Sequence, residues 1–429
     1  MVNVVRFSPP LGEPLGLDFR PGPMDHTVLL QLVSEGRTGF NGVVFDPVAA
    51  EGPHKELLEE ANGRYLETVL DPKFMELATP VGFTETRAAK VPWAGTEQHT
   101  PATLSGMAGR AKAQRLADFV ARLGFSSVIT PCHFIYGAED PLFPVDLRLT
   151  EELRFALDRA GAQDVTLQYP LALPGTVFAN ASARTAIMQA LRQLPIDAVR
   201  LRVHPFGNNS GHVSLLRYVQ AARALVAMDL PIIAERTGNI GLALLSFAAV
   251  SGLESGVTFG DAFNMGLLKE RRASSGFAAP RVYIPELGLF VPKKAAKAMA
   301  AHSRLRSLVT CKNPACCHRG DGVIVNSRRH FVFSRIEEVS TLNRPPAQQR
   351  PGEYLERMLR PATDRLARVL QVNIEDDQLR TKLEHERDKQ AGWRGTLGEL
   401  AAQPVVAVPR TPTRRATRRR RAMARDQRD

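Results

Sequence analysis

Between residue 40 and about residue 270, short apolar runs alternate with longer amphipathic stretches. In the amphipathic stretches apolar residues recur at i, i+3, i+4 and i+7, a period that predicts helices. One such set is Leu153, Ala156, Leu157 and Ala160. The apolar runs predict strands at residues 39–47, 65–72, 126–134, 164–173, 198–206, 231–236 and 255–261.

The predicted strands are continuous apolar runs, as expected for a parallel sheet covered by helices. Seven such strands with helical crossovers favour an α/β fold, a closed (β/α)8 TIM-type barrel, over an open doubly wound sheet. No G-x-G-x-x-G follows the first predicted strand, which weakens the dinucleotide-binding alternative. Residues 281–302 are expected to supply a final strand and helix.

The character of the sequence changes after the predicted barrel. We expect a barrel over residues 1–300, a cysteine-rich subdomain over 301–345 and a helical extension over 346–403. Residues 404–429 are rich in Pro, Thr and Arg and almost lack large apolar side chains. Such a segment buries too little surface to fold alone, so we expect a disordered tail.

The formal net charge of +12 is unevenly distributed. The last twenty residues hold nine Arg and two Asp, which leaves the other 409 residues with a net charge of +5. Arginines neutralise phosphates and release counterions, so the tail is expected to contact a nucleic-acid backbone in DNA or RNA. The arginines concerned are Arg414, Arg415, Arg418, Arg419, Arg420 and Arg421. The alternative is a solubilising terminus.

No run approaches 18 uninterrupted apolar residues, so no membrane span is expected. The N-terminus, MVNVVRFSPP, lacks the charged and apolar regions of a signal peptide. With four cysteines and no export signal, we expect a reducing cytoplasm, where thiols do not pair.

Three of the four cysteines fall within the run CKNPACCHRG, residues 311–320. Zn²⁺ prefers four nitrogen or sulfur ligands in a tetrahedron, so the cluster predicts a structural zinc site. Its candidate ligands are Cys311, Cys316, Cys317 and His330. Ligation by both adjacent cysteines is expected to strain the backbone. One of them is alternatively a bystander or a packed side chain, with His318 taking its place.

A barrel followed by a cysteine-rich loop and a later histidine resembles the tRNA-guanine transglycosylase superfamily. SGVTFGDAFN, residues 255–264, is similar to the segment with the nucleophilic aspartate, here Asp261. AERTGNIGLA, residues 234–243, resembles the loop that receives the base, with Glu235, Gly238 and Gly241 as substrate-binding residues. FGNNSGHVSLLR, residues 206–217, resembles the loop that offers an amide, from Asn208 or Asn209.

The resemblance implies exchange of a guanine-type base in tRNA or DNA, including insertion of a deazaguanine. It also implies an aspartyl glycosyl-enzyme intermediate on Asp261, with Asp71 or Asp46 as acid and base. The family signature D-S-G-G-F-Q is absent. Two other functions therefore stay open: a catalytically inactive zinc-containing barrel that binds nucleic acid, and an unrelated barrel enzyme acting on a small substrate.

The positions of these aspartates along the chain support a catalytic role without the resemblance, because residues directly after barrel strands lie at the catalytic face. A carboxylate can attack C1′ of a nucleotide without prior deprotonation, and a second carboxyl group can transfer protons. The residues that meet this test are Asp46, Asp71, Glu235 and Asp261, together with Cys132, His133 and His204. Alternatively, Asp46 and Asp71 start Asp-Pro turns and Asp261 caps a helix.

Overall fold

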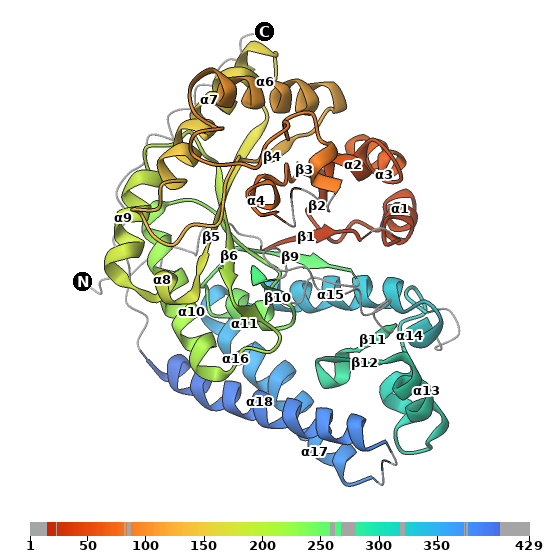
Figure 1. Cartoon of the computed structure of the whole chain (residues 1–429). Helices are drawn as coiled ribbons and strands as arrows, with labels where there is room; N and C mark the ends of the chain where they lie inside the picture. The colour runs from red at the N-terminus through yellow and green to blue at the C-terminus, as the bar shows by residue number, and fades with distance from the viewer. Residues whose placement is uncertain are drawn as a thin grey trace, which may run out of the picture.

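The structure is a computed structural model, and it describes residues 15–22, 24–80, 83, 87–257, 262–266, 280–317, 322–372, 374 and 376–403. Eight parallel strands pair in sequence, and the last pairs back to the first, which closes a barrel (Figure 1). They are β1 (Gly16–Arg20), β2 (Gly42–Phe45), β3 (Glu67–Leu70), β4 (Ser127–Ile129), β5 (Thr166–Pro174), β6 (Ala198–His204), β8 (Ile232–Glu235) and β9 (Gly252–Gly256). The predicted TIM-type barrel is confirmed.

Helices follow the strands and cover the outside of the barrel (Figure 1). They are α1 (His26–Ser34), α2 (Pro47–Ala50), α3 (Lys55–Gly63), α4 (Phe74–Leu77), α6 (Gly106–Leu123), α7 (Phe143–Arg159), α8 (Gly175–Ala179), α9 (Ala181–Leu191), α10 (His212–Leu225) and α11 (Ile240–Ser246). Helix α6 shows why the sequence folds in this way. It buries an apolar stripe from Ala113 to Val120 and ends at Gly124, whose φ of 69° suits glycine.

Three parts of the sequence prediction are wrong in detail. The first barrel strand, β1, lies before the predicted region. Residues 281–292 supply no barrel strand: they form an antiparallel hairpin of β11 (Arg281–Ile284) and β12 (Leu289–Pro292). The strand predicted at 255–261 is β9, which begins at Gly252 and ends at Gly256.

The interior of the barrel has an apolar side and a charged side. Val44, Val69 and Ile129, from β2, β3 and β4, form a small buried cluster. The charged side comes from β1, β6, β8 and β9, which contribute the buried residues Asp18, Arg200, Arg202, Glu235 and Glu254. Charged side chains are rarely buried unless paired, so this half of the interior must be held by ion pairs.

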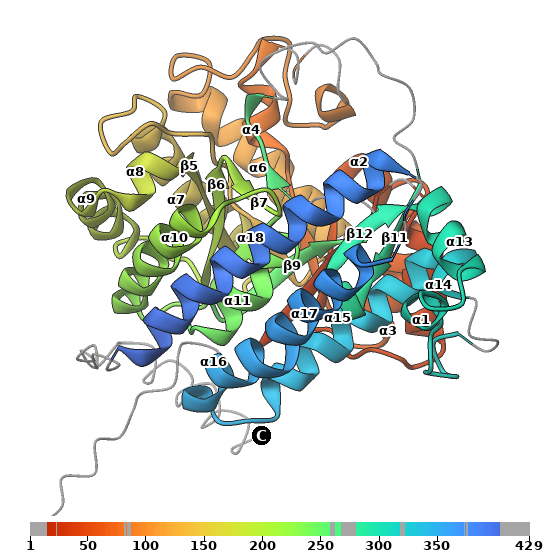
Figure 2. The same cartoon turned by 90° about the horizontal axis from the view of Figure 1, so that it is seen from below.

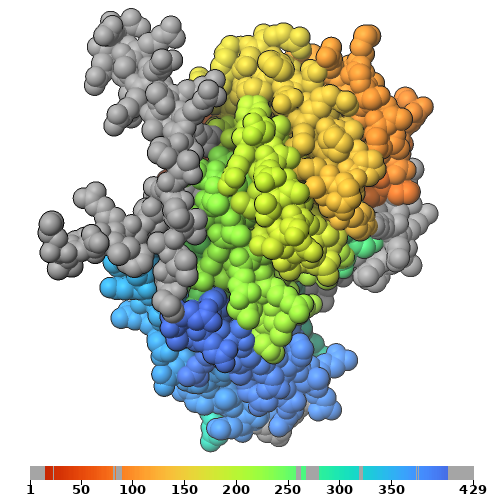
Figure 3. Space-filling model, turned by 90° about the vertical axis from the view of Figure 1, so that its left-hand side faces the viewer, coloured from red at the N-terminus to blue at the C-terminus, as the bar shows by residue number. Residues whose placement is uncertain are grey.

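The chain after the barrel packs as a separate layer beside it (Figures 1 and 2). Besides the hairpin it contains α13 (Lys293–Ala301), the 3₁₀ turn η4 (Arg306–Val309), α14 (Gly322–Val325), α15 (Ser327–Asn343), α16 (Arg350–Glu353), η6 (Tyr354–Leu359), α17 (Arg360–Leu370) and α18 (Asp377–Ala402). A second apolar core joins the hairpin to α13, α17 and α18. Figure 3 shows the blue C-terminal helices against the yellow-green part of the chain that includes α10.

Among the described residues, no helix is both long enough and apolar enough to cross a membrane.

Candidate functional site

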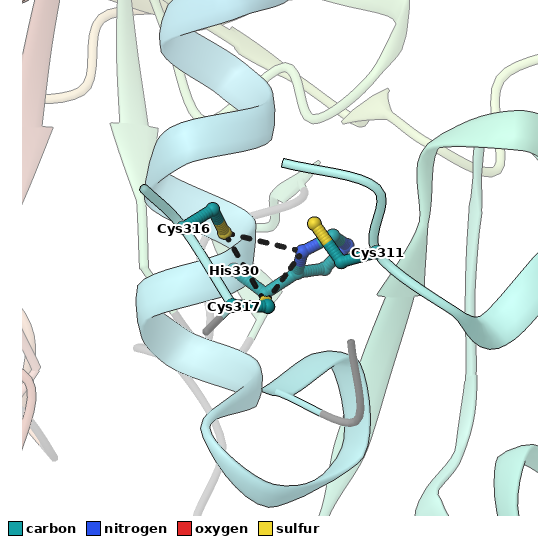
Figure 4. A group of neighbouring side chains, drawn as sticks. All are labelled: Cys311, Cys316, Cys317 and His330. Carbon is teal, nitrogen blue, oxygen red and sulfur yellow. Dashed lines mark hydrogen bonds between the residues drawn. The ribbon is translucent and has the colours of Figure 1, made fainter. Parts of the chain in front are cut away.

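Four potential metal ligands converge beside the barrel. The ligand atoms of Cys311, Cys316, Cys317 and His330 all lie within 4.8 Å of one another (Figure 4). The cysteines come from the loop after η4, and the histidine comes from the first turn of α15. Cys316, Cys317 and His330 are buried, and Cys311 is partly exposed. The predicted ligand set is thus assembled in space.

The spacing of these atoms matches a tetrahedral zinc site. With Zn–S bonds of about 2.3 Å and Zn–N bonds of about 2.0 Å, two sulfurs lie about 3.8 Å apart and a sulfur and a nitrogen about 3.5 Å apart. The Cys316 and Cys317 sulfurs are 3.4 Å apart, and His330 Nδ1 is 3.5 and 3.6 Å from them. The cluster could therefore hold a metal ion, and its donor set is the one that zinc prefers.

The His330 ring is oriented for ligation through Nδ1. Its other nitrogen, Nε2, lies 3.5 Å from the Ser334 hydroxyl oxygen, which itself donates to the His330 carbonyl at 2.8 Å. The hydroxyl oxygen can therefore accept a hydrogen bond from Nε2–H, which leaves the Nδ1 lone pair free for an ion. Burial lowers the pKa of His330 to about 4, so the imidazole is in the neutral form that a metal requires.

The adjacent cysteines reach the cluster without backbone strain, contrary to the sequence prediction. The amides of Cys316 and Cys317 both donate to the Asn313 carbonyl, at 3.1 and 2.9 Å, in a tight turn. Neither residue has a positive φ. Gly322 permits the close packing of α14, because a Cβ there would lie 2.5 Å from the Cys317 sulfur. The alternative ligand His318 lies outside the described residues.

Helix α15 also ties the metal cluster to the barrel. Arg335 is buried, with 1% of its side chain exposed, and it donates to the Asn239 side chain in the loop after β8. Asn239 in turn donates to the Gly288 carbonyl at 2.6 Å, in the turn of the β11–β12 hairpin. The loop after β8 is thus held from the side of the C-terminal layer.

The two loops that the sequence analysis assigned to base binding contact each other. The side-chain oxygen of Asn208 accepts from the Asn239 amide at 2.7 Å, next to Gly238, whose φ is 59°. A Cβ at Gly238 would lie 2.2 Å from that oxygen and would displace the Asn208 side chain, and the positive φ also favours glycine here. Gly241 packs against Leu253, and Asn209 is exposed. The structure therefore brings Asn208 and Gly238 together and leaves Asn209 apart.

Asp71 and Glu235 lie where β3 and β8 end, as predicted, and each is buried among cations. One oxygen of Asp71 accepts from Arg20 at 2.8 Å and from Arg202 at 2.9 Å, and it is 3.5 Å from the Lys73 ammonium. Burial alone would raise the pKa of Asp71, but these three cations hold it well below its usual value. Asp71 is therefore ionised at neutral pH and has no proton to donate, and the same cations make it a weak base.

Glu235 belongs to the same network. It accepts from Arg200 at 3.1 Å and also pairs with Arg202, and these guanidinium groups lower its pKa to about 2 against the effect of burial. Arg200 also contacts Glu254 at 3.1 Å and the carboxylate of Asp18. The network thus runs across the interior from β1 to β8.

The other strand-end residues have structural partners. Asp46 caps α2: its Oδ1 accepts from the Val48 and Ala49 amides at 3.0 and 3.2 Å, as the turn alternative predicts. His204 Nδ1 accepts from the Met265 amide at 3.0 Å. His133 is buried, and its Nδ1 lies 2.6 Å from the Asp146 carboxylate, within hydrogen-bonding distance.

Sequence reasoning missed Asp18, Arg20, Arg200, Arg202 and Glu254. A signal for two of them was present: Arg200 and Arg202 alternate with Val199, Leu201 and Val203 in a strand, so both arginines face one side. That side is the interior. The predicted nucleophile Asp261 and the tail arginines Arg414, Arg415, Arg418, Arg419, Arg420 and Arg421 lie outside the described residues.

The stability of the network is expected to depend on pH through Asp18. Burial raises the pKa of Asp18 to about 7, against the effect of Arg200, and Glu254 is its register partner on β9. The folded chain then keeps a proton that the unfolded chain has released, so stability falls as pH rises from about 4 to 7. Asp18→Asn should therefore gain stability relative to wild type over this interval. Urea unfolding of both proteins at pH 4, 6 and 8 measures the difference in their free energies of unfolding. A difference that does not change with pH would refute the prediction.

No protein-family model matches the chain, and no curated protein matches it. Solved structures of similar architecture include the Penicillium canescens endo-1,4-beta-xylanase XylE, with 12% identity and a TM-score of 0.36 over 56% of this chain and 82% of that one. Another is a type I 3-dehydroquinate dehydratase from Clostridium difficile, with 10% identity and a TM-score of 0.37 over 60% of this chain and 91% of that one. Likeness at this level carries no functional inference, and the barrel is defined by its own strand pairing.

Fold and site together define a (β/α)8 barrel protein with a buried Cys3His cluster in its C-terminal layer.

Proposed function

We propose that the chain is a zinc-containing barrel enzyme that exchanges a guanine-type base in nucleic acid, DNA or tRNA. The observation that carries the proposal is the Cys3His cluster, which a loop and a helix after the barrel assemble beside it. This is the arrangement that the resemblance to the tRNA-guanine transglycosylase superfamily implies. The contact between Asn208 and the Gly238–Asn239 loop gives further support, because both segments are assigned to base recognition.

In this mechanism Asp261 is the nucleophile. Its carboxylate forms a bond to C1′ of the nucleotide as the bond from C1′ to the base nitrogen breaks and the base leaves with its electron pair. The incoming base then attacks C1′ and releases the carboxylate. The incoming base must lose a proton, and the resemblance assigns the acid and base roles to Asp71 or Asp46. Asp46 is engaged at the start of α2, so Asp71 is preferred to it.

The zinc ion has a structural role in this proposal. It would be held by Cys311, Cys316, Cys317 and His330, and it would fix the cysteine loop to α15. Since α15 also holds the loop after β8 through Arg335, the ion would support the base-binding loop from a distance.

Replacing Asp261 by asparagine is expected to abolish base exchange and to leave polymer binding within about three-fold of wild type, because only the attacking carboxylate is lost. The protein is incubated with duplex DNA, and separately with bulk tRNA, plus radiolabelled guanine or a deazaguanine. Asp164→Asn is the matched control, because Asp164 is an exposed acid at the opposite, amino end of β5.

The outcomes separate the open alternatives. Label that enters one polymer and depends on Asp261 supports the proposal and identifies the polymer. Exchange by Asp261→Asn at the wild-type rate would refute the nucleophile. No label in either polymer, with zinc present and polymer bound, would favour the inactive nucleic-acid-binding protein. No polymer binding at all would favour an enzyme that acts on a small substrate.

A further inference from the structure

A long stretch of the C-terminal layer contains cations and no acids. Between Leu287 and Gly320 the sequence has seven Lys and Arg residues and no Asp or Glu. The last twenty residues carry a net charge of +7. These two segments together account for more than the whole formal net charge of +12, so the rest of the chain is slightly acidic. The charge is therefore concentrated, and one of its two centres includes helix α13.

Helix α13 places three of these cations on its outer face. Lys294 and Lys297 are exposed and Lys293 is partly exposed, whereas Ala295, Ala296 and Met299 are buried in the second apolar core. Positions 293, 294 and 297 are neighbours on a helix surface, because residues three and four apart share a face. The three ammonium groups thus lie on one side.

Exposed cations continue along the chain past the end of α13, and one of them, Arg306, lies against the helix. Arg304, Arg306 and Lys312 are exposed, and Arg306 Nε donates to the Ala300 carbonyl at 3.0 Å, which places Arg306 at the last turn of the helix. The turn η4, which begins at Arg306, packs on α13. We call the set Lys293, Lys294, Lys297, Arg304, Arg306 and Lys312 the basic face.

The basic face has no acidic partners within the described part of the chain: none of its six residues forms an ion pair there. Some exposed cations on other helices are paired with acids, as Arg360 is with Glu356 and Arg380 is with Glu384. Like charges that gather without acids repel one another and gain stability only when an anion binds. The arrangement is therefore suited to an anionic partner.

We propose that the basic face binds the phosphate backbone of a nucleic-acid duplex. The proposal extends the proposed function by locating where the polymer lies, and its test does not depend on base exchange. A duplex carries one negative charge per about 1.7 Å of its axis, which suits cations spread along a helix and the turn after it. The basic face offers several separate charges, as a polymer requires.

The same geometry argues against a membrane surface. Helices that bind membranes bury large apolar side chains in the lipid beside their cations. The apolar side of α13 is instead buried inside the protein, and its outer face adds only Ala298 and Ala301 to the lysines. A nucleic-acid backbone needs only the charges.

Lysine footprinting of the full chain tests the proposal directly. The protein is acetylated with and without a 30-base-pair duplex, and modification is read by mass spectrometry at Lys293, Lys294, Lys297 and Lys312. The duplex is expected to slow acetylation of these lysines at least about three-fold. Lys55 is the internal control, because it is exposed and paired with Glu59.

Salt-dependent binding tests the same surface by substitution. The triple variant Lys293→Gln, Lys294→Gln, Lys297→Gln is expected to bind the duplex at least about ten-fold more weakly and to lower the slope of log K against log salt by about 3, since each phosphate contact contributes about 0.9. The matched control replaces Arg110, Arg115 and Arg159 by Gln. These arginines lie on α6 and α7, far from α13 in Figures 1 and 2. The control should bind within about two-fold of wild type.

The outcomes are distinct from those of the base-exchange assay. Unchanged acetylation at the basic face while the duplex is bound would overturn the proposal and assign binding to another surface. Protection by phosphatidylglycerol vesicles and not by duplex would overturn it in favour of a membrane. Protection by duplex in a protein that exchanges no base would support the basic face and refute the proposed function alone.

Discussion

Cys316→Ser is expected to reduce bound zinc from about one ion per chain to background and to loosen the C-terminal layer while the barrel stays folded. The Cys316 sulfur faces both the Cys317 sulfur and His330 Nδ1, so its removal leaves three ligands and opens the tetrahedron. Zinc contributes about 10–16 kcal/mol to the folding of small zinc-binding peptides, so a large local effect is expected.

Cys132→Ser is the matched control for this prediction. Cys132 is the fourth cysteine of the chain; it is buried after β4, where its sulfur lies 3.4 Å from Asp146, and it takes no part in the cluster. Zinc content is measured by atomic emission, and hydrogen exchange is measured in α14 and α15. Equal zinc in the two variants would show that Cys316 is not a metal ligand.

Arg200→Met is expected to destabilise the protein by about 3–5 kcal/mol, the cost of removing one partner from a buried ionic network. The Arg200 side chain is fully buried, and it contacts the carboxylates of Asp18, Glu235 and Glu254. Methionine fills similar space but carries no charge, so three buried acids would lose a common partner. The acids would then have to take up protons or become solvated.

The free energy of unfolding in guanidinium chloride measures this effect. The control is Arg192→Met, because Arg192 is exposed and its guanidinium donates only to the Ala227 carbonyl. That change should cost no more than about 0.5 kcal/mol. A loss of less than about 1 kcal/mol in Arg200→Met would show that the buried acids do not depend on this arginine.

The barrel could be predicted because most of its strands are continuous apolar runs. Strand β1 could not, since the sequence GLDFR puts charges at Asp18 and Arg20, the positions that face the interior. Their charges are balanced by β6 and β9, which are distant in sequence. A criterion based on local hydrophobicity therefore fails where the interior itself is charged.

The metal cluster could be predicted because three of its four ligands lie within seven residues and the fourth follows on a helix. The sequence analysis assigned base recognition to both the Asn208 segment and the Gly238–Asn239 loop. That the two segments contact each other could not be predicted, because nothing in either sequence indicates the contact. The basic face was also visible as a run without acids. That the lysines of this run lie on one side could be seen only in the structure, where α13 buries the alanines between them.

Helix α15 carries both His330 and Arg335, which contact opposite neighbours. They are five positions apart, about 7.5 Å along the helix axis and about 140° around it. Inserting one residue between them would rotate one side chain by about 100° relative to the other. His330 could then no longer reach the cysteine loop while Arg335 contacts the loop after β8. In families of related sequences, this interval is therefore expected to tolerate substitution and to exclude changes in length.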